Sequence, residues 1–478
     1  SSYFHSADSE KSEPLTASSD AHVPKIVPAK SNQSGVNGNE KKYELKVYKR
    51  RWIVVALFMF YSGMSAYQWV EYSIVSNIVR RYYGVSSVAV DWTSMSYMLY
   101  YVILVVPGSY LAERIGLRWT TVLGSSVCCL GSWIKVLSVQ PDRFWVTFIG
   151  QSLVASTQVL VLTTPGRLAA QWFDSHQLST ATSISICGNQ LGVALGFLIT
   201  PMVVRNHENL DDIGADLSTH FWTVAIITTV STLLVIIFFR DEPRLPPSET
   251  RALQRANANT NKESFVEPMK RLFTNKSFLI LCNAYGLNVG VLNAVGTLLN
   301  QIYLCHFKNG EKEAGVLGLL VIIMGMVGSV TFGIILDKTK KGTTVTVYFL
   351  TLLGQIMFAI AMWWEVKSIV YVAAVFLGIF MSGYLALGYE MCAEYTYPEA
   401  ESIATGILNV ANNIYGIILV IISGLLMESY GDLGAHICLC VALIVGFVMT
   451  VMTKDETRRQ DARKAAMYSV VKPKEGII

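Results

Sequence analysis

The sequence has few charged residues for its length. Asp, Glu, Lys and Arg make up 15% of 478 residues, whereas hydrophobic residues make up 52%. A soluble globular chain carries about 25% charged residues, so this balance argues against a soluble protein. Twelve runs of roughly 20 mostly apolar residues occur along the chain, each long enough to cross a hydrocarbon core about 30 Å thick. We therefore expect an all-α, multi-pass membrane protein.

The sequence also lacks the patterns of metal sites, disulfide frameworks and enzymes. The eight cysteines fall mostly inside apolar runs and show no C-x-x-C spacing, which argues against a zinc site or a disulfide framework. No nucleophile and base at catalytic spacing, phosphate-cradling glycine loop or metal-ligand cluster occurs within the apolar runs. We expect no metal, no cofactor and no enzymatic activity.

The apolar runs divide the chain into two equal groups. We place them at about 52–79, 92–112, 119–139, 144–166, 178–204, 219–239, 277–304, 314–336, 344–364, 368–391, 402–427 and 434–453. Six helices precede the polar segment 241–276 and six follow it, which is typical of two repeated halves. We expect a tail (1–50), a first half (51–240), a linker (241–276), a second half (277–453) and a tail (454–478).

Basic residues indicate the orientation. Most of the 38 Lys and Arg residues fall on one side if both chain ends lie in the cytoplasm, with clusters at 41–51, 240–276, 337–342 and beyond 454. Few fall on the other face, among them Lys135. This topology accounts for the net charge of +4, so no nucleic-acid partner is expected. Residues 1–50 have no apolar core and no signal-peptide pattern, and we expect them to be disordered.

Two loops at equivalent places in the halves are similar to each other. "AERIGLRW" (112–119) and "GIILDKTKKGT" (333–343) each put an acidic residue at a helix end, with basic residues and glycine close by. They resemble the signature loop of the major facilitator superfamily, and a simple charged turn at the membrane surface is the alternative. The resemblance implies gating or loop roles for Glu113, Arg118 and Asp337.

A further acidic pair lies near the expected cytoplasmic end of the tenth helix. Glu390 and Glu394 share one helix face because they are four residues apart. We expect a salt bridge to the loops above or to Arg167, and at most a gating role.

Polar side chains within the apolar runs are unevenly distributed. They concentrate on the expected helices 1, 4, 5, 7, 10 and 11, while helices 6, 9 and 12 are almost purely apolar between their ends. In the fold that the resemblance implies, helices 1, 4, 7 and 10 line a central cavity between the halves. The distribution fits a water-filled pathway, because a buried amide needs a partner or solvent. For any single amide, bonding between helices is an equal alternative.

The stretch "SAYQWVEYS" (65–73) puts polar residues deep in the first apolar run. On a continuous helix, Ser65, Trp69 and Tyr72 would share one face and Glu71 a neighbouring one. Trp69 lies too deep for an interfacial anchor, and an indole face suits a quaternary ammonium group. A packing tryptophan is the alternative.

Longer motifs carry a more specific resemblance. "AYQWVEYSIVSNI", "GNQLGVALGFL", "GYLALGYE" and "TYPEAESIATGILNVANNIYG" look like the feline leukaemia virus subgroup C receptor family, and the similarity runs from about Arg50 to Lys454. It implies twelve membrane helices in two six-helix halves, cytoplasmic termini, and facilitative uptake of choline or ethanolamine by a plasma-membrane monomer. Haem transport, coupling of an organic cation to protons, and a receptor role without transport are the alternatives.

The family's substrate cage is only partly matched. Trp69 and Gln190 match its tryptophan and glutamine, whereas Leu292 and Asn293 replace an aromatic pair, and Asn413 and Glu71 each replace a glutamine. Tyrosines could restore the aromatic wall, the options being Tyr67, Tyr72, Tyr97, Tyr285, Tyr384 and Tyr415. The expected substrate-binding set is Trp69, Glu71, Tyr72, Tyr97, Gln190, Leu292, Asn293 and Asn413.

Glu71 and the histidines bear on the alternatives. Glu71 could be a counter-ion for a cation, a proton-exchanging group, or a member of a hydrogen-bond network with Gln68 or Asn293. Haem iron is usually ligated by His, Cys, Met or Tyr. All seven histidines are expected in tails, loops or helix ends, which weakens the haem alternative.

Overall fold

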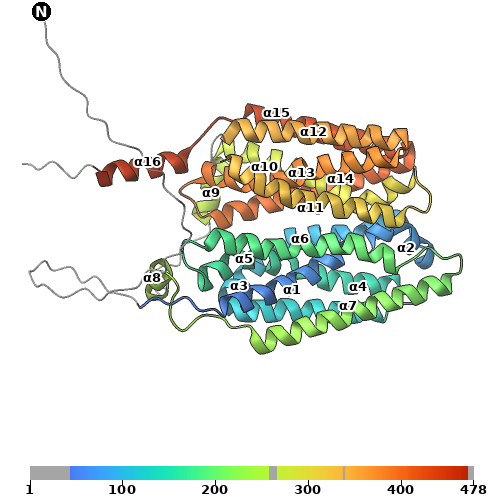
Figure 1. The fold of residues 1–478 in the computed structure, drawn as a ribbon, viewed down its shortest axis with the longest axis horizontal. Helices are drawn as coiled ribbons and strands as arrows, with labels where there is room; N and C mark the ends of the chain where they lie inside the picture. Colours follow the sequence, from blue (N-terminus) through green and yellow to red (C-terminus); the bar gives the residue numbers. More distant parts are fainter. Residues whose placement is uncertain (1–43, 258–265, 337–339, 472–478) are drawn as a thin grey trace, which may run out of the picture. The chain divides into compact units, whose positions relative to one another are not determined.

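The structure is a computed structural model that describes residues 44–257, 266–336 and 340–471. Within these residues it contains helices and no strand (Figure 1). The expected tail 1–50 therefore lies almost entirely outside the described part. The all-α membrane fold predicted from the sequence is confirmed.

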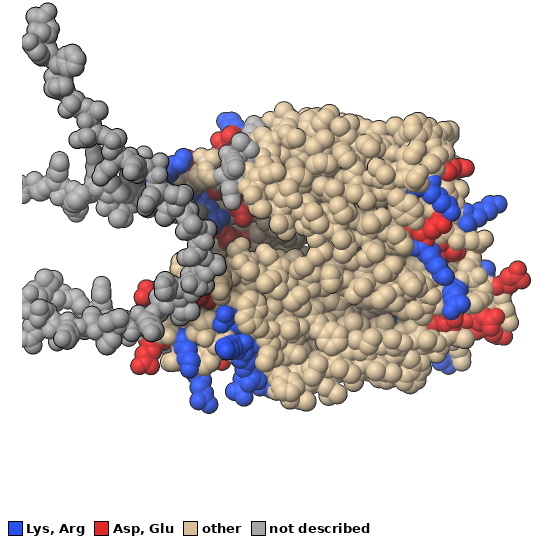
Figure 2. All heavy atoms as spheres, viewed as in Figure 1, with Lys and Arg blue, Asp and Glu red and all other residues tan. Residues whose placement is uncertain are grey.

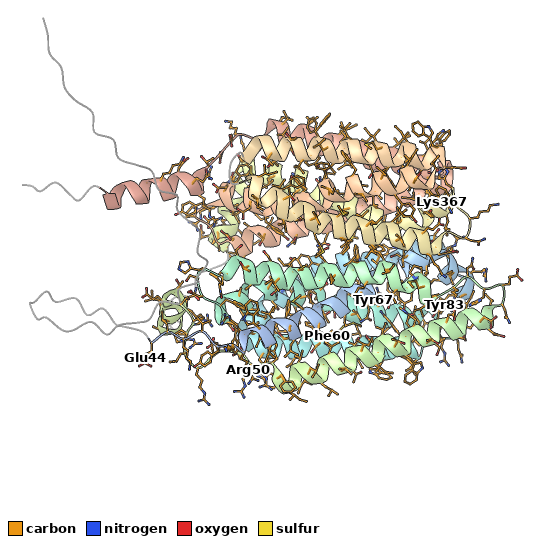
Figure 3. All side chains as sticks on the ribbon, viewed as in Figure 1. Glu44, Arg50, Phe60, Tyr67, Tyr83 and Lys367 are labelled. Atoms are coloured by element: carbon orange, nitrogen blue, oxygen red, sulfur yellow. The ribbon has the colours of Figure 1, made fainter. Side chains whose placement is uncertain are left out.

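The first half of the chain forms one bundle. Its elements are α1 (Arg51–Val70), the 3₁₀ turn η1 (Ser73–Val75), α2 (Ser76–Tyr83), α3 (Ser87–Val136), α4 (Phe144–Ser156), α5 (Gln158–Trp172), α6 (Leu178–Val203) and α7 (Leu210–Phe238). The linker contains α8 (Glu249–Asn257) and α9 (Val266–Thr274). Figure 3 shows α1 entering at Arg50 and passing Phe60 and Tyr67 towards the end of the bundle that carries Tyr83.

The second half forms a matching bundle. It comprises α10 (Lys276–Leu304), α11 (Glu311–Leu336), α12 (Lys340–Trp364), α13 (Lys367–Thr396), α14 (Glu401–Tyr430) and α15 (Asp432–Met452), followed by α16 (Arg458–Val471). The two bundles lie side by side in Figure 1, with α6 against α11 and α3 against α14. In Figure 2, charged residues gather at the two ends and the surface between them is uncharged, as a lipid-facing surface requires.

The helix α3 accounts for two of the expected crossings. A straight helix of its 50 residues would be about 75 Å long, more than twice the hydrocarbon thickness. It is interrupted at Gly116, whose φ of 84° and ψ of 172° are not helical. A side chain there would also crowd the Asp241 carboxylate, since a Cβ would lie 3.2 Å from Oδ1. Eleven helices in the described residues are long and apolar enough to cross a membrane. The count of twelve crossings and the cytoplasmic position of both ends remain predictions.

Two expected helices differ from those observed. The first apolar run is interrupted after Val70, and the sixth begins at Leu210 instead of near residue 219. His220 therefore lies ten residues inside α7 and is buried. The expectation that every histidine lies in a tail, a loop or a helix end was wrong for His220, because polar residues in the first turns of α7 hide its start from a hydropathy pattern.

A histidine joins three helices at the end of the second half where α10 stops. His306 Nε2 lies 2.5 Å from Asp432 Oδ2 at the start of α15, and Nδ1 lies 3.1 Å from Glu365 Oε1 between α12 and α13. Burial lowers the pKa of His306, but the hydrogen bonds to the two carboxylates more than offset it. The pKa is therefore raised above its ordinary value of 6.5.

We predict that this junction weakens as the pH rises. A raised pKa in the folded state gives a stabilisation that is complete below the ordinary pKa and is lost as the pH rises through the folded-state pKa. The apparent melting temperature of the purified protein should fall between about pH 6 and pH 8 more steeply for wild type than for His306→Gln. His176→Gln, at an exposed loop histidine, serves as the control. Equal slopes in wild type and His306→Gln would contradict the prediction.

Candidate functional site

The two halves are joined by hydrogen bonds at the end that carries α2 and the α10–α11 connection, which we call the sealed end. Asn300 Nδ2 donates to the carbonyl oxygen of Ile74 at 2.8 Å and to Asn77 Oδ1 at 3.2 Å. Asn77 Nδ2 donates to Glu311 Oε1 at 2.8 Å. Gln301 Nε2 donates to Asp91 Oδ1 at 2.7 Å. We call Asn77, Asp91, Asn300, Gln301 and Glu311 the seal.

The opposite end of the molecule is hollow. Figure 2 shows an opening between the two bundles at the end where α8, α9 and α16 lie. The seal lies at the other end, because α2 and the start of α11 are there (Figure 1). The molecule therefore has a central space that is closed at one end and open at the other.

Trp69 lies where the two halves meet. Its side chain is half-buried and packs against the apolar clusters of both halves. A Cβ added to Gly296 of α10 would lie 3.6 Å from Cη2 of Trp69 and 3.6 Å from Cζ of Phe197 of α6. The indole and the Phe197 ring thus lie close to the same point on α10, and the cavity position expected for Trp69 remains a prediction.

Four more of the expected binding residues lie half-buried on helices that meet between the halves. Leu292 and Asn293 are on α10. The side chain of Asn293 lies close to α14, because a Cβ added to Gly416 of that helix would be 3.4 Å from Asn293 Nδ2. Asn413 of α14 donates to the carbonyl oxygen of Asn409 at 2.8 Å. Gln190 on α6 has no hydrogen bond to another described residue, so its amide is available to a ligand.

The structure adds residues that the sequence did not single out. Phe197 gave no signal because a phenylalanine in an apolar helix is ordinary. Tyr415, one of several tyrosines considered, donates a hydrogen bond from its hydroxyl to Asn283 Oδ1 between α14 and α10. The hydroxyl of Tyr389 donates to Asn409 Oδ1 at 2.9 Å. These tyrosines and amides form a polar wall on the second half.

Three expected binding residues lie elsewhere, inside the first half. The hydroxyl of Tyr97 donates to the carbonyl oxygen of Ser65 at 2.8 Å, and the hydroxyl of Tyr72 bonds to Thr147 of α4. Glu71 is also buried, with 2% exposure. Glu71 and Tyr72 follow the last residue of α1 and keep helical backbone angles, with φ of −64° and −94°. The first half therefore holds the polar groups of all three residues, and Tyr97 belongs to an apolar cluster against which Trp69 packs.

Glu71 belongs to a buried charged group that we call the clamp, made of Gln68, Glu71, Lys135 and His220. Glu71 Oε1 pairs with Lys135 Nζ of α3, and Oε2 lies 3.2 Å from His220 Nε2 of α7. Lys135 Nζ also donates to Gln68 Oε1 at 3.0 Å. Lys135 lies in the last turn of α3 and is 1% exposed, and the side of the membrane expected for it remains a prediction. Of the three roles considered for Glu71, this geometry corresponds to the network, with Lys135 and His220 as partners in place of Asn293.

The expected gating residues are placed as follows. Glu113 is exposed, and Arg118 donates through its main-chain N to Asp241 Oδ1 at 3.2 Å and through its guanidinium to the carbonyl oxygen of Ile236 at 3.1 Å. Asp337 lies outside the described residues. Glu390 is exposed and Glu394 is buried. Arg167 donates to the carbonyl oxygen of Ala112 at 2.7 Å, which ties α5 to the first loop.

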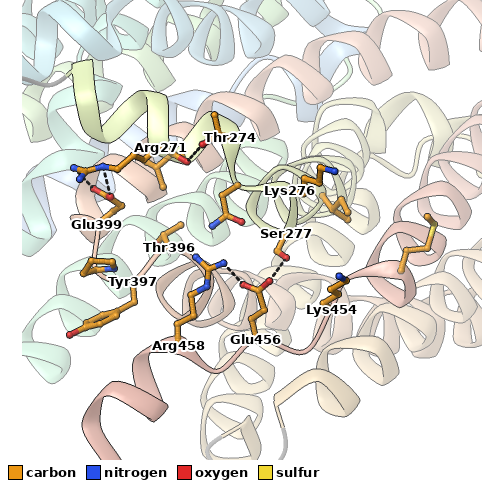
Figure 4. Close-up of a pocket in the computed structure, with 15 residues that line it drawn as sticks. Arg271, Thr274, Lys276, Ser277, Thr396, Tyr397, Glu399, Lys454, Glu456 and Arg458 are labelled. Carbon is orange, nitrogen blue, oxygen red and sulfur yellow. Dashed lines mark hydrogen bonds and ion pairs between the residues drawn. The ribbon is translucent and has the colours of Figure 1, made fainter. Parts of the chain in front are cut away.

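A separate pocket of about 580 Å³ lies at the open end of the second half (Figure 4). Its charged lining comprises Arg271, Lys276, Lys454, Arg458, Glu399 and Glu456. Both acids are engaged, Glu399 by Arg271 at 2.8 Å and Glu456 by Arg458 at 2.9 Å. Four basic groups and two paired acids have the wrong sign for a cationic substrate, so this pocket is not the candidate site.

A fold and a polar space of this kind define a membrane transporter, and the comparison with family models agrees. The model described as Major Facilitator Superfamily matches residues 52–372 and 343–474, so the chain belongs to that superfamily. Among solved structures, a bacterial homologue of the human lysosomal transporter Spinster in an inward-facing conformation has a TM-score of 0.64 at 12% identity, covering 85% of this chain and 98% of that one. The Escherichia coli fucose transporter FucP in an outward conformation gives 0.61 at 13% identity, covering 85% and 100%. These structural similarities show the fold of the chain.

Closer relatives identify the family within that superfamily. The chain is 42% identical over 421 residues to the choline/ethanolamine transporter flvcr2a of Danio rerio, covering 88% of this chain and 89% of the relative. It is 40% identical over 441 residues to FLVCR2 of Homo sapiens, covering 92% and 84%, and 41% over 415 residues to FLVCR1 of Felis catus, covering 86% and 74%. The chain belongs to the FLVCR family of multi-pass membrane transporters, as the sequence predicted, and is not an enzyme.

We predict that Asn300→Ala opens the sealed end. The change removes the bonds to Ile74 and Asn77 without adding bulk, so the state open at that end should gain population. The rate at which a membrane-impermeant maleimide modifies Val90→Cys, a buried position beside Asp91, should rise in protein that also carries Cys305→Ser. Asn288→Ala is the matched control, because Asn288 is a buried α10 amide without a hydrogen-bond partner among the described residues. Equal rates in both backgrounds would contradict the role of the seal.

Proposed function

We propose that the chain carries choline and ethanolamine across the membrane by facilitative alternating access. The proposal rests on the opening between the two bundles at one end and the seal at the other, together with the position of Trp69 beside Gly296 of the second half. The names of relatives that are 40–42% identical over most of the chain support the substrate class. We further propose that the protein acts as a monomer in the plasma membrane.

The proposed cycle follows from the two ends of the molecule. In the described state, the substrate enters or leaves through the open end. The opposite state requires the bonds of the seal to break and the bundles to close at the other end, with the binding site staying between the halves. The donors of the seal are uncharged amides, and the acceptors are a carbonyl, an amide and the carboxyl groups of Asp91 and Glu311. A bond between neutral groups typically contributes about 0.5–1.5 kcal/mol, and a bond to a charged group about 1.5–3 kcal/mol. A seal of this strength is compatible with repeated opening.

The proposed site combines aromatic rings and amides. The quaternary ammonium group of choline would lie against the indole of Trp69, an interaction of about 0.5–2 kcal/mol. Leu292 and Asn293 offer no aromatic wall from α10. Phe197 of α6 lies close to the same point on α10 as Trp69 but is only 2% exposed, so the indole is the aromatic surface of the proposed site. The amide of Gln190 is free to bond the hydroxyl group that choline and ethanolamine share.

We predict that Trp69→Ala removes most uptake of choline and ethanolamine while the amount of protein at the cell surface stays unchanged. Trp69→Phe should retain part of the activity, because a smaller π face remains. Uptake of labelled choline, ethanolamine and a haem analogue by cells expressing each variant is measured beside an empty vector. Trp363→Ala, at a surface position of α12, is the control. Wild-type uptake by Trp69→Ala would exclude the proposed site, and uptake of the haem analogue alone would favour the alternative substrate.

We predict that Gln190→Ala weakens the binding of substrates with a hydroxyl group. Loss of one hydrogen bond should raise the apparent KM for choline and ethanolamine by up to about ten-fold, which corresponds to about 1.4 kcal/mol. Tetramethylammonium has no hydroxyl group, so its inhibition of choline uptake in wild type and in Gln190→Ala should be equal once the altered KM is taken into account. An equal loss of affinity for tetramethylammonium would show that Gln190 supports the fold instead of the substrate.

A further inference from the structure

The first membrane segment is broken between Glu71 and Val75. The helix α1 ends at Val70, residues 71 and 72 form a turn, and η1 leads into α2 at Ser76. Val75 has a φ of −118° and a ψ of 33°, outside the helical region. Trp69 lies immediately before this break and Asn77 shortly after it.

The polar side chains at the start of the break bond to the first half. Glu71 bonds to Lys135 of α3 and His220 of α7, and Gln68 Oε1 accepts from Lys135 at 3.0 Å and from Ser132 at 3.1 Å. The Lys135 ammonium also lies 5.3 Å from the centroid of the Tyr72 ring. On the opposite side, Gln151 donates to the carbonyl oxygen of Gln68 at 2.9 Å.

The segment after the break bonds to both halves. Asn300 of α10 bonds to the carbonyl oxygen of Ile74 and to Asn77, and Glu311 of α11 accepts from Asn77. Further along α2, the hydroxyl groups of Tyr82 and Tyr83 donate to the carbonyl oxygens of Val139 and Ser138 after α3, at 3.1 and 2.9 Å. Within the first segment, Ile74 and Asn77 are therefore the residues that must leave the second half when the seal opens.

The two sets of bonds differ in strength. The clamp contains a fully buried ion pair, and removing either partner would leave an unpaired charge at low dielectric. Hydrogen bonds with an ionised partner are roughly twice as strong as neutral ones. Two of the four bonds given for the seal join neutral groups and two have a carboxylate as acceptor, but none of the four is an ion pair, so the seal yields before the clamp does.

We propose that Glu71, Lys135 and His220 are positioning residues, which fix the near side of a hinge at residues 71–75 so that Trp69 keeps its place when Ile74 and Asn77 leave the second half. The inference deepens the proposed function, since Trp69 is the residue whose position is maintained. Glu71 then affects substrate binding by holding the backbone that carries Trp69, and not as a counter-ion for the substrate. None of the three side chains needs to reach the cavity.

The test uses the full chain in lipid nanodiscs. The double variant Glu71→Gln, Lys135→Gln removes both charges and keeps hydrogen-bonding groups. The hinge is read from the distance distribution between spin labels on native Cys305 and on Arg81→Cys at the end of α2, both exposed at the sealed end. We expect a broader distribution than in wild type, together with a KM for choline about five-fold higher or more and little change in Vmax.

Two further variants separate positioning from stability. The swapped pair Glu71→Lys, Lys135→Glu restores an ion pair and should recover most of the wild-type distance distribution and KM. Gln355→Leu, which removes a buried amide of α12 that contacts His436, should lower the melting temperature without changing either readout.

A double variant with a lower melting temperature but wild-type distances and KM would overturn the proposal, because the clamp would then only stabilise the fold. If the double variant does not fold, the swapped pair alone tests the proposal. A distance distribution in the swapped pair that is broader than that of wild type would also overturn the proposal. The spin-label distances require no substrate. Absence of choline uptake in wild type would therefore refute the proposed function and leave the hinge test intact.

Discussion

A carboxylate and an ammonium group lie in contact within the first bundle, almost without exposure, at a depth where an unpaired charge is costly. Removing one member of such a pair typically destabilises a protein by about 3–5 kcal/mol, so Glu71 and Lys135 constrain each other. The pair ties α1 to α3, and His220 extends the tie to α7. The end of α1, and with it the position of Trp69, depends on this interaction.

The two halves use different chemistry where the first segment meets them. The first half holds it with a buried ion pair, and the second half holds it with hydrogen bonds from the amide of Asn300 and to the carboxylate of Glu311, so the first attachment is the harder one to break. Alternating access needs one stable attachment and one that can break, because a binding site must keep its geometry while one of its walls moves. The close approach of α1 and α6 supports the fixed side, since a Cβ on Gly192 would lie 2.1 Å from the carbonyl oxygen of Gly63.

Hydropathy predicted the helices well because a bilayer demands long apolar runs, and most helix ends agree within a few residues. It could not predict the break after Val70, since residues 71–75 continue an apolar run in which only Glu71 is charged. Trp69 and Gln190 were predictable from local motifs. The partners of Glu71 were not, because Lys135 and His220 are 64 and 149 residues away and only the packing of three helices brings them together.

The signs of the charges along the molecule are consistent with a cationic substrate. The pocket with an excess of basic groups lies on the second half away from the seal, whereas the seal contains the carboxylates of Asp91 and Glu311. Both carboxyl groups accept hydrogen bonds from amides of the seal. When those amides separate in the proposed cycle, the entrance that forms between the halves is lined by two acidic side chains, and an acidic lining raises the local concentration of a cation. The charges of Glu71 and Lys135 cancel within the clamp, so this pair adds nothing to that field. In the proposed site, recognition of the cation then rests on the aromatic ring of Trp69.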